Sequence, residues 1–142
     1  MEENFMAEAL QEARKAESKG EVPIGAVIVR KGKIIARGHN MRERKRNALA
    51  HAEVIAINRA CRKLKSWRLD DCEMYVTLQP CPMCAGAILN ARIWRVVIGA
   101  LRPNDESMDI YQNNSLNWKT QVDVELDTEC GDILKRFFKN AR

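Results

Sequence analysis

Residues Met74 to Ala91 read MYVTLQPCPMCAGAILNA, which predicts a strand followed directly by a helix. The stretch from Met74 to Leu78 is apolar, aromatic or β-branched throughout, as is typical of a buried strand. Pro80 suits the first turn of a helix, because an amide in that turn would lack an intrahelical partner anyway. We therefore expect a helix from Pro80 to about Ala91.

The sequence on both sides continues this alternation of helical and extended patterns. Apolar residues recur three and four apart in the helical segments, and β-branched residues are frequent in the extended ones. The predicted helices are Phe5–Lys19, Ala50–Leu64 and a last helix capped by Asp127 that ends near Phe138. The predicted strands are Val22–Val29, Lys33–Gly38, Trp94–Ala100 and Gln121–Glu125. His39–Ala48 and Leu101–Lys119 are predicted to be polar loops, and the whole pattern indicates an α/β sandwich.

The composition indicates one globular domain over residues 1–142. A chain of 142 residues with 46% hydrophobic content can build one core of ordinary size but not two. No run approaches the roughly 18 apolar residues of a membrane span, and the N-terminus lacks the apolar stretch of a secretory signal. We therefore expect a cytoplasmic protein without a membrane partner.

Charge and cysteine content narrow the function further. The formal net charge of +5 favours a polyanionic partner such as nucleic acid. The five cysteines are an odd number in a chain without a secretory signal, which argues against a disulfide framework. Some of these thiols are then expected to be metal ligands or core residues.

Two short segments contain the candidate metal ligands. Cys81 and Cys84 form a Cys-x-x-Cys pair at the start of a predicted helix, where the helix N-terminus lowers thiol pKa values toward the thiolate that zinc requires. His51, at the start of another predicted helix, would be a third ligand. Three protein ligands leave the fourth tetrahedral position for water, which is typical of catalytic rather than structural zinc.

Glu53 is the candidate proton carrier. It follows His51 by two residues, so on a regular helix the two side chains would point about 200° apart. They can cooperate only around the helix end, with His51 binding a metal beyond it and Glu53 reaching the water. The spacing therefore favours Glu53 as a catalytic residue that is not a ligand.

Other interpretations of the cysteines remain open at this point. The Cys-x-x-Cys pair could be a redox pair, or half of a structural four-cysteine zinc site that includes Cys61 and Cys72. Cys61 lies on the apolar stripe of its predicted helix, and it forms no close pair with Cys72.

The sequence around these residues resembles the cytidine deaminase superfamily, and within it the bacterial tRNA-specific adenosine deaminases. The H-x-E and P-C-x-x-C patterns are those of zinc-dependent deaminases. Segments that resemble the family are EVPIGAVIV at Glu21–Val29, GHN at Gly38–Asn40, HAEVIAIN at His51–Asn58, WRL at Trp67–Leu69, YVTLQPCPMCAGAI at Tyr75–Ile88, RVVIGA at Arg95–Ala100 and FFKNAR at Phe137–Arg142.

The resemblance implies a three-layer α/β/α sandwich with a central mixed sheet and one zinc ion per chain. It implies that Glu53 passes protons from water to the base ring and to departing ammonia. The implied reaction converts adenosine to inosine at the wobble position of a tRNA anticodon loop, and the implied enzyme is a homodimer with RNA lying across both subunits. The candidate substrate-binding residues are Asn40, Ala52, Arg42, Arg44, Asn117, Phe138 and Arg142.

Basic residues cluster near the predicted pocket. Arg42, Arg44, Lys45 and Arg46 follow Asn40 closely and could contact phosphates, although such a run is often only a solvated surface. Phe138 could likewise be core packing or a base-stacking surface.

The chain departs from the family pattern on the substrate side. Leu101–Ser107 reads LRPNDES where the family has a glycine-rich loop, Asn117 is followed by Trp118 rather than His, and Gln79 replaces a common Glu. Trp118 could close a smaller pocket, which would suit a free base such as guanine or cytosine. A deaminase of a free base or nucleoside is therefore the first alternative, and a non-catalytic zinc-stabilised RNA-binding module is the second.

Overall fold

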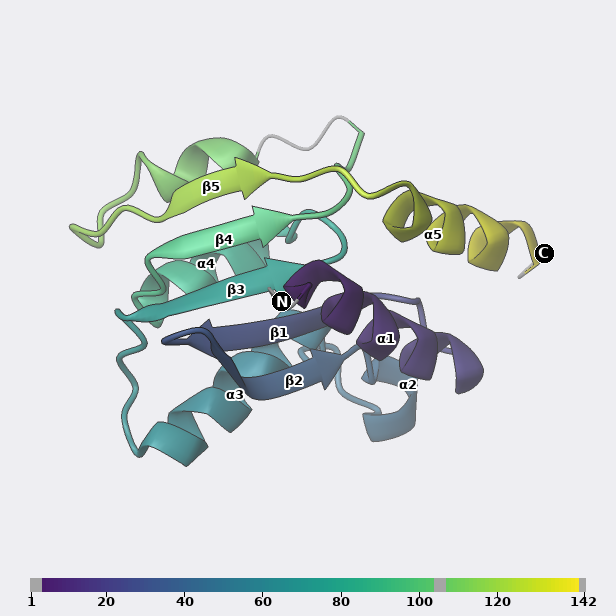
Figure 1. The fold of residues 1–142 in the computed structure, drawn as a ribbon, viewed down its shortest axis with the longest axis horizontal. Coiled ribbons are helices and arrows are strands. Elements are labelled where there is room, and N and C mark those ends of the chain that lie inside the picture. The colour runs from purple at the N-terminus through teal and green to yellow at the C-terminus, as the bar shows by residue number, and fades with distance from the viewer. Residues whose placement is uncertain (1–3, 104–106, 141–142) are drawn as a thin grey trace.

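A central sheet with the strand order β2-β1-β3-β4-β5 organises the fold (Figure 1). The computed structural model describes residues 4–103 and 107–140. The strands are β1 Gly25–Arg30, β2 Lys33–His39, β3 Cys72–Val76, β4 Arg95–Ile98 and β5 Gln121–Val124. The helices are α1 Phe5–Ser18, α2 Arg42–Lys45, α3 Ala52–Leu64, α4 Pro82–Asn90, the 3-10 helix η1 Ser107–Tyr111 and α5 Thr128–Asn140.

The sheet is mixed, as predicted. β1 runs antiparallel to both β2 and β3, whereas β3, β4 and β5 run parallel to one another. Parallel neighbours have their carboxyl ends at the same edge of the sheet. The residues that follow β3 and β4 therefore meet at one edge, and these residues include Cys81 and Arg102.

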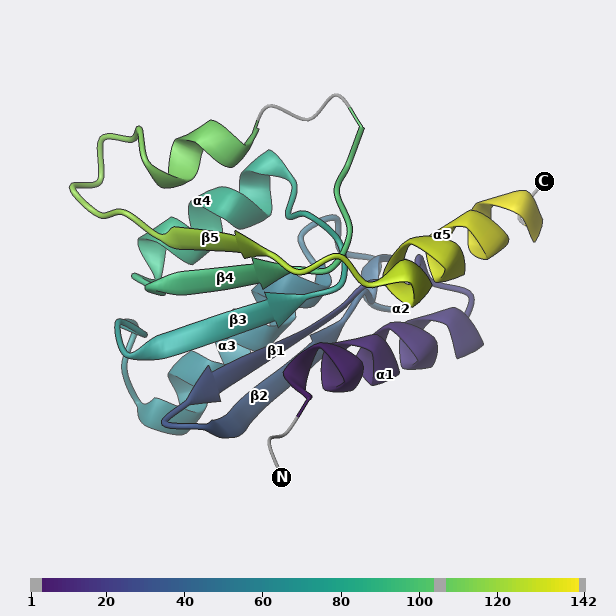
Figure 2. The ribbon, with the colours of Figure 1, turned by 45° about the horizontal axis from the view of Figure 1, so that its top comes forward.

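Helices cover both faces of the sheet, which gives the fold three layers with an apolar core on each side of the sheet. Side chains alternate along β1, so that Ala26 and Ile28 pack in the core under α3 and α4, and Val27 and Val29 pack in the core with α1 and α5. Figures 1 and 2 show α1 on one face of the sheet and α3 and α4 on the other. The predicted α/β/α sandwich is confirmed.

Two glycines let helices approach the sheet closely. A Cβ atom at Gly25 would lie 2.0 Å from the Ala9 carbonyl oxygen of α1, and one at Gly38 would lie 2.4 Å from the Ala52 carbonyl oxygen of α3. Any side chain at either position would clash with helix backbone. Gly38 thus allows the first turn of α3, which follows His51, to lie directly against β2.

Two short elements were not predicted, because both lie in polar segments without periodicity. α2 lies in the predicted loop His39–Ala48, and η1 lies in the predicted loop Leu101–Lys119. Among the described helices, none combines the length and the apolar character that crossing a membrane requires.

Candidate metal centre and substrate cavity

His51, Cys81 and Cys84 come together where α3 and α4 begin. His51 is the N-cap residue of α3, Cys81 is the N-cap residue of α4, and Cys84 is buried in the first turn of α4. The His51 Nδ1 atom lies 3.7 Å from Cys81 Sγ and 3.5 Å from Cys84 Sγ. All three ligand atoms lie within 4.8 Å of one another.

This spacing fits a tetrahedral zinc ion. Bond lengths of about 2.1 Å to nitrogen and 2.3 Å to sulfur place two ligands of tetrahedral zinc about 3.6 Å apart. The pKa of Cys81 is lowered to about 5, chiefly by a hydrogen bond with Cys84 and also by the amides of Cys84 and Met83, against the opposing effect of burial. One thiolate is therefore favoured at neutral pH before any metal binds.

The other cysteines lie elsewhere. Cys61 lies within hydrogen-bonding distance of the Trp67 carbonyl oxygen, and Cys72 is buried in β3, where burial raises the pKa of its thiol to about 12. Within residues 4–103 and 107–140, His51, Cys81 and Cys84 form the only cluster with metal-ligand spacing. A four-cysteine site that includes Cys61 and Cys72 does not form.

Glu53 lies beside this cluster without belonging to it. Its side chain is in the first turn of α3, is only 3% exposed and hydrogen-bonds with the Cys84 thiol. Burial raises the pKa of Glu53 to about 7. The structure thus brings the predicted carboxylate to the three predicted ligands.

A cavity of about 270 Å³ adjoins the cluster and shares His51 with it. This volume is near the lower end of the range for small-molecule pockets, roughly 300–1,000 Å³. The predicted substrate-binding residues Asn40, Arg42, Ala52 and Phe138 all line it. The other lining residues are Val22, Ile24, Leu78, Arg102 and Leu134.

Asn40 has an unusual environment within this cavity. Its side chain is 4% exposed, and no group of the described residues donates a hydrogen bond to its Oδ1 atom. A buried amide oxygen without a donor costs free energy, on the order of 1–3 kcal/mol. A ligand that donates a hydrogen bond here would remove that cost.

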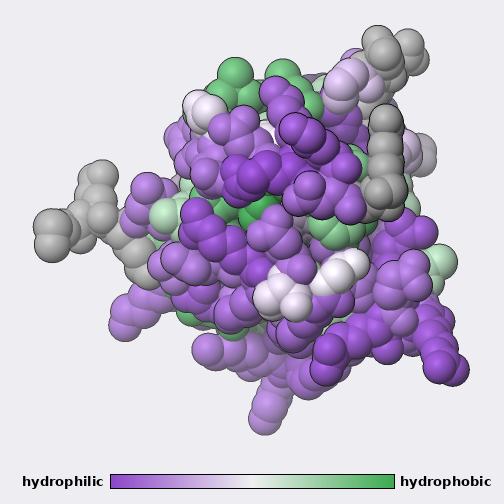
Figure 3. Space-filling model, turned by 90° about the vertical axis from the view of Figure 1, so that its right-hand side faces the viewer, coloured by the Kyte–Doolittle hydropathy of each residue, from purple (hydrophilic) through white to green (hydrophobic). Residues whose placement is uncertain are grey.

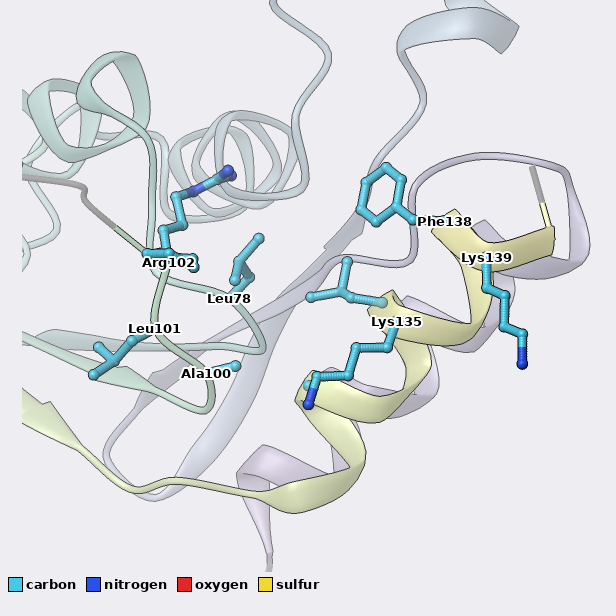
Figure 4. A pocket seen from close by; sticks show the side chains of 10 residues that line it. Leu78, Ala100, Leu101, Arg102, Lys135, Phe138 and Lys139 are labelled. Carbon is cyan, nitrogen blue, oxygen red and sulfur yellow. The ribbon is translucent and has the colours of Figure 1, made fainter. Parts of the chain in front are cut away.

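A larger cavity of about 690 Å³ lies next to the first, between residues 100–103 and α5 (Figure 4). The two cavities share Leu78, Arg102, Leu134 and Phe138. Figure 4 shows Leu78 and Arg102 on one side, and Lys135, Phe138 and Lys139 on α5 on the other. The small cavity beside His51 therefore continues into a wider space with cationic side chains at its border.

Arg102 is a site residue that the sequence did not identify. Its backbone amide donates to Gln79 Oε1 at 3.1 Å, and its Nε donates to the Gln79 carbonyl oxygen at 2.8 Å. Gln79 directly precedes Pro80 and Cys81, so Arg102 is tied to the segment that holds the metal ligands. The available signal was its place in Leu101–Ser107, the segment that departs from the family pattern on the substrate side.

Asn117 and Trp118 do not line the site, which corrects two predictions. The Trp118 indole donates to the Ile93 carbonyl oxygen at 3.1 Å, just before β4 begins, and its ring packs against the core under α3 and α4. Asn117 borders a separate surface hollow with Trp118 and Lys119. Both precede β5 and so lie at the amino edge of the parallel strands, away from His51.

The structure does not place two other predicted residues at the site. Arg44 is exposed on α2 and lines neither cavity. Arg142 lies outside the described residues.

The comparisons with known proteins agree with this geometry. The sequence profile of the MafB19-like deaminases matches residues 1–142. The chain belongs to this deaminase family. The deaminase is 47% identical to the tRNA-specific adenosine deaminase of Bacillus subtilis, over 99% of this chain and 91% of that protein. It is 40% identical to the tRNA-specific adenosine deaminase of Aquifex aeolicus, over 99% and 95%.

Solved structures support the same relationship. A structure from work on A-to-I editing by tRNA:A34 deaminases superposes with a TM-score of 0.87 at 40% identity, covering 92% of this chain and 98% of that one. A guanine deaminase from Bacillus subtilis superposes with a TM-score of 0.66 at 32% identity, covering 95% and 92%. The predicted kinship with the bacterial tRNA deaminases is confirmed.

Proposed function

We propose that this deaminase converts adenosine to inosine at the wobble position of tRNA. The Bacillus subtilis and Aquifex aeolicus relatives are both named tRNA-specific adenosine deaminase, and the similar structure with a TM-score of 0.87 comes from work on A-to-I editing at the wobble position of tRNA. The observation that carries the proposal is the continuity of the two cavities, because a flipped base in the small one needs space beyond it for the attached RNA. A tRNA substrate also agrees with a cytoplasmic location.

The reaction replaces an amino group by oxygen, so a C–N bond breaks as a C–O bond forms. His51, Cys81 and Cys84 would hold one zinc ion, which when bound would make water nucleophilic at neutral pH. Glu53 would accept a proton from the attacking water and deliver protons to the ring and to the departing ammonia. Its burial beside the ligands supports this role.

The remaining residues of the small cavity would recognise the base. The Asn40 Oδ1 atom, which accepts no hydrogen bond from the described part of the chain, can accept one from a base N–H, and Ala52 leaves room against the start of α3. Phe138 offers an aromatic face, since its side chain is largely exposed at the border of both cavities. Unstacked RNA bases bind such faces.

Cationic side chains near the cavities would contact the RNA backbone. Arg42 and Arg102 line the small cavity, and Lys135 and Lys139 border the large one. Figure 3 shows the side of the molecule toward which β3, β4 and β5 point, and hydrophilic residues predominate there. Arg44 belongs to the exposed turn next to Arg42, and Arg142 extends the basic C-terminal segment in the sequence.

The substrate is tested by single-turnover deamination of an anticodon stem-loop with adenosine at the wobble position, beside free guanine, cytosine and adenosine. We expect conversion of the stem-loop only. Binding should weaken steeply with salt, and Arg42→Gln should shallow the log–log slope by about one unit or less, because one phosphate contact is lost. Ready turnover of free guanine without binding of the stem-loop would establish the free-base alternative instead.

We also propose that two copies associate through the outer face of α3 and α4. A groove of about 520 Å³ lies there between Val54, Ile57 and Ala87, and the adjacent Trp67 side chain is 59% exposed. The guanidinium groups of Arg68 and Arg92 lie 5.3 and 5.7 Å from the Trp67 ring centroid. An exposed tryptophan over an apolar groove is typical of an interface hot spot.

Sedimentation analysis of Trp67→Glu tests this surface. We expect a dimer for the parent chain and a monomer for the variant, because the aromatic anchor is lost and a hydrated carboxylate would have to be desolvated in its place. Leu126→Glu is the control, since Leu126 is also exposed but follows β5. A monomeric parent chain would contradict the dimer, and a dimeric Trp67→Glu would exclude this face.

A further inference from the structure

Glu21 is a buried carboxylate that lies outside the proposed chemistry. It follows the C-terminal end of α1, where its amide donates to the Ala16 carbonyl oxygen at 3.0 Å, and it is only 2% exposed. Its Oε1 accepts from the Glu43 amide at 3.2 Å and its Oε2 accepts from the Arg44 amide at 2.8 Å. Both oxygens thus bind backbone of α2, more than twenty residues further along the chain.

The one-turn helix α2 is anchored just before its first residue by Met41, which packs with Ala50 and Ile55 and whose amide donates to the Ala50 carbonyl oxygen at 2.9 Å. None of its residues is buried, and the side chain of its N-cap residue, Met41, makes no capping hydrogen bond. The first amides of a helix lack intrahelical acceptors, and a side chain from elsewhere can supply them. The Glu21 carboxylate supplies acceptors for two of these amides, from the segment between α1 and β1.

The position of α2 matters for the substrate cavity. Arg42, its first residue, lines the small cavity beside His51, and Asn40 precedes it by two positions. Val22 and Ile24, which follow Glu21, line the same cavity. The Glu21 hydrogen bonds therefore join two segments that border the site.

We propose that Glu21 is a positioning residue that fixes α2, so that Arg42 and the adjacent basic residues face the RNA. This inference rests on the proposed tRNA substrate. Glu21 does not touch the base or the metal ligands. Each oxygen of the Glu21 carboxylate accepts a hydrogen bond from one amide of α2. A neutral amide side chain has one oxygen and one NH₂ group, so it cannot accept in the same way at both positions. This explains why a negative charge is kept close to a surface that binds RNA.

The two possible effects of this carboxylate on RNA binding have opposite signs. If Glu21 acted only through its charge, its removal would strengthen binding of the RNA polyanion. If it acts by positioning, Glu21→Gln must weaken binding, because the amide keeps one acceptor and turns an NH₂ group toward the second N–H. The near-isosteric substitution leaves the packing unchanged.

Glu43→Gln is the matched control. It removes the same charge from the same turn, where the Glu43 side chain is exposed, and it leaves the Glu43 amide free to donate to Glu21. We expect Glu21→Gln to raise the Kd of the anticodon stem-loop about tenfold, as for one lost charge-assisted hydrogen bond. Glu43→Gln should leave that Kd unchanged or lower it, and both variants should keep the parent zinc content.

Trypsin gives a second measurement that needs no RNA. The sequence RERKR at residues 42–46 contains four cleavage sites for this protease. Cleavage within it should be faster for Glu21→Gln than for the parent chain and Glu43→Gln, at a temperature well below the melting temperatures of all three proteins. Equal cleavage rates in all three proteins, or tighter RNA binding by both variants, would overturn the positioning role. Failure of the parent chain to bind the stem-loop would instead reject the tRNA substrate, while the cleavage rates would still decide whether Glu21 holds α2.

Discussion

Glu53→Gln is expected to lower the deamination rate by about four orders of magnitude, at the upper end of what general acid–base catalysis contributes. The carboxylate has two tasks in the proposed reaction, since protons must leave the attacking water and reach the base and its leaving group. Glutamine fills the same buried space beside Cys84 but cannot accept and release a proton. Single-turnover deamination measures the rate, and metal analysis of the same sample measures zinc.

Glu12→Gln is the control for loss of a buried carboxylate. Glu12 is 2% exposed in α1, on the other face of the sheet, and pairs with Lys15 at 2.6 Å and His39 at 3.2 Å. Burial raises the pKa of Glu12, but the hydrogen bonds and charges of Lys15 and His39 outweigh it, so the pKa lies below 4.5. Its ionised form therefore stabilises the fold above about pH 4.5, and this contribution is lost as pH falls. Glu12→Gln should lower the melting temperature at pH 7 without changing the rate of the folded enzyme.

Two results would contradict the assignment of Glu53. Loss of zinc from Glu53→Gln would make this residue a ligand or a structural support of the cluster. A rate within about tenfold of the parent would show that another group transfers the protons.

The metal centre could be predicted from the sequence because its determinants are local. Cys81 and Cys84 are three residues apart, and His51 and Glu53 are two apart, each pair at the start of a helix. Helix N-termini orient such side chains within one turn, so little depends on the rest of the fold. Only the meeting of the two helix ends required tertiary structure.

The misplacement of Asn117 has a topological cause. β5 is parallel to β4, so the chain between them must return from the carboxyl edge of the sheet to the amino edge. Arg102, at the start of this connection, therefore borders both cavities, whereas Asn117, near its end, lies at the other edge. The sequence predicted both strands but contained no signal for their relative direction, so the resemblance to the family assigned the wrong end of the loop.

The α2 turn was missed for a different reason. Its residues are all polar or charged, and the acceptors of its first amides belong to Glu21, distant in sequence. A helix held by a remote side chain leaves no periodic pattern of its own. Local propensity alone therefore predicts a loop there.

Cys84→Ser is expected to leave purified protein with far less than one zinc ion per chain and without deaminase activity. Cys84 is the most enclosed of the three ligands, since its side chain is fully buried in the first turn of α4, and a serine hydroxyl is a much poorer zinc ligand than a thiolate. Even changes to groups that only orient zinc ligands cost about 10- to 100-fold in affinity, so loss of a ligand should cost more. Elemental analysis after dialysis measures the zinc content.

Cys61→Ser provides the matched control, because it makes the same substitution at a half-buried cysteine whose Sγ lies 3.9 Å from the Trp67 carbonyl oxygen. This variant should keep one zinc ion and the parent activity. If Cys84→Ser retained its zinc, or if Cys61→Ser lost it, the ligand set would differ from His51, Cys81 and Cys84. If instead both variants kept activity without any zinc, the three side chains would serve another chemistry, and the proton-transfer role of Glu53 would have to be assigned again without a metal.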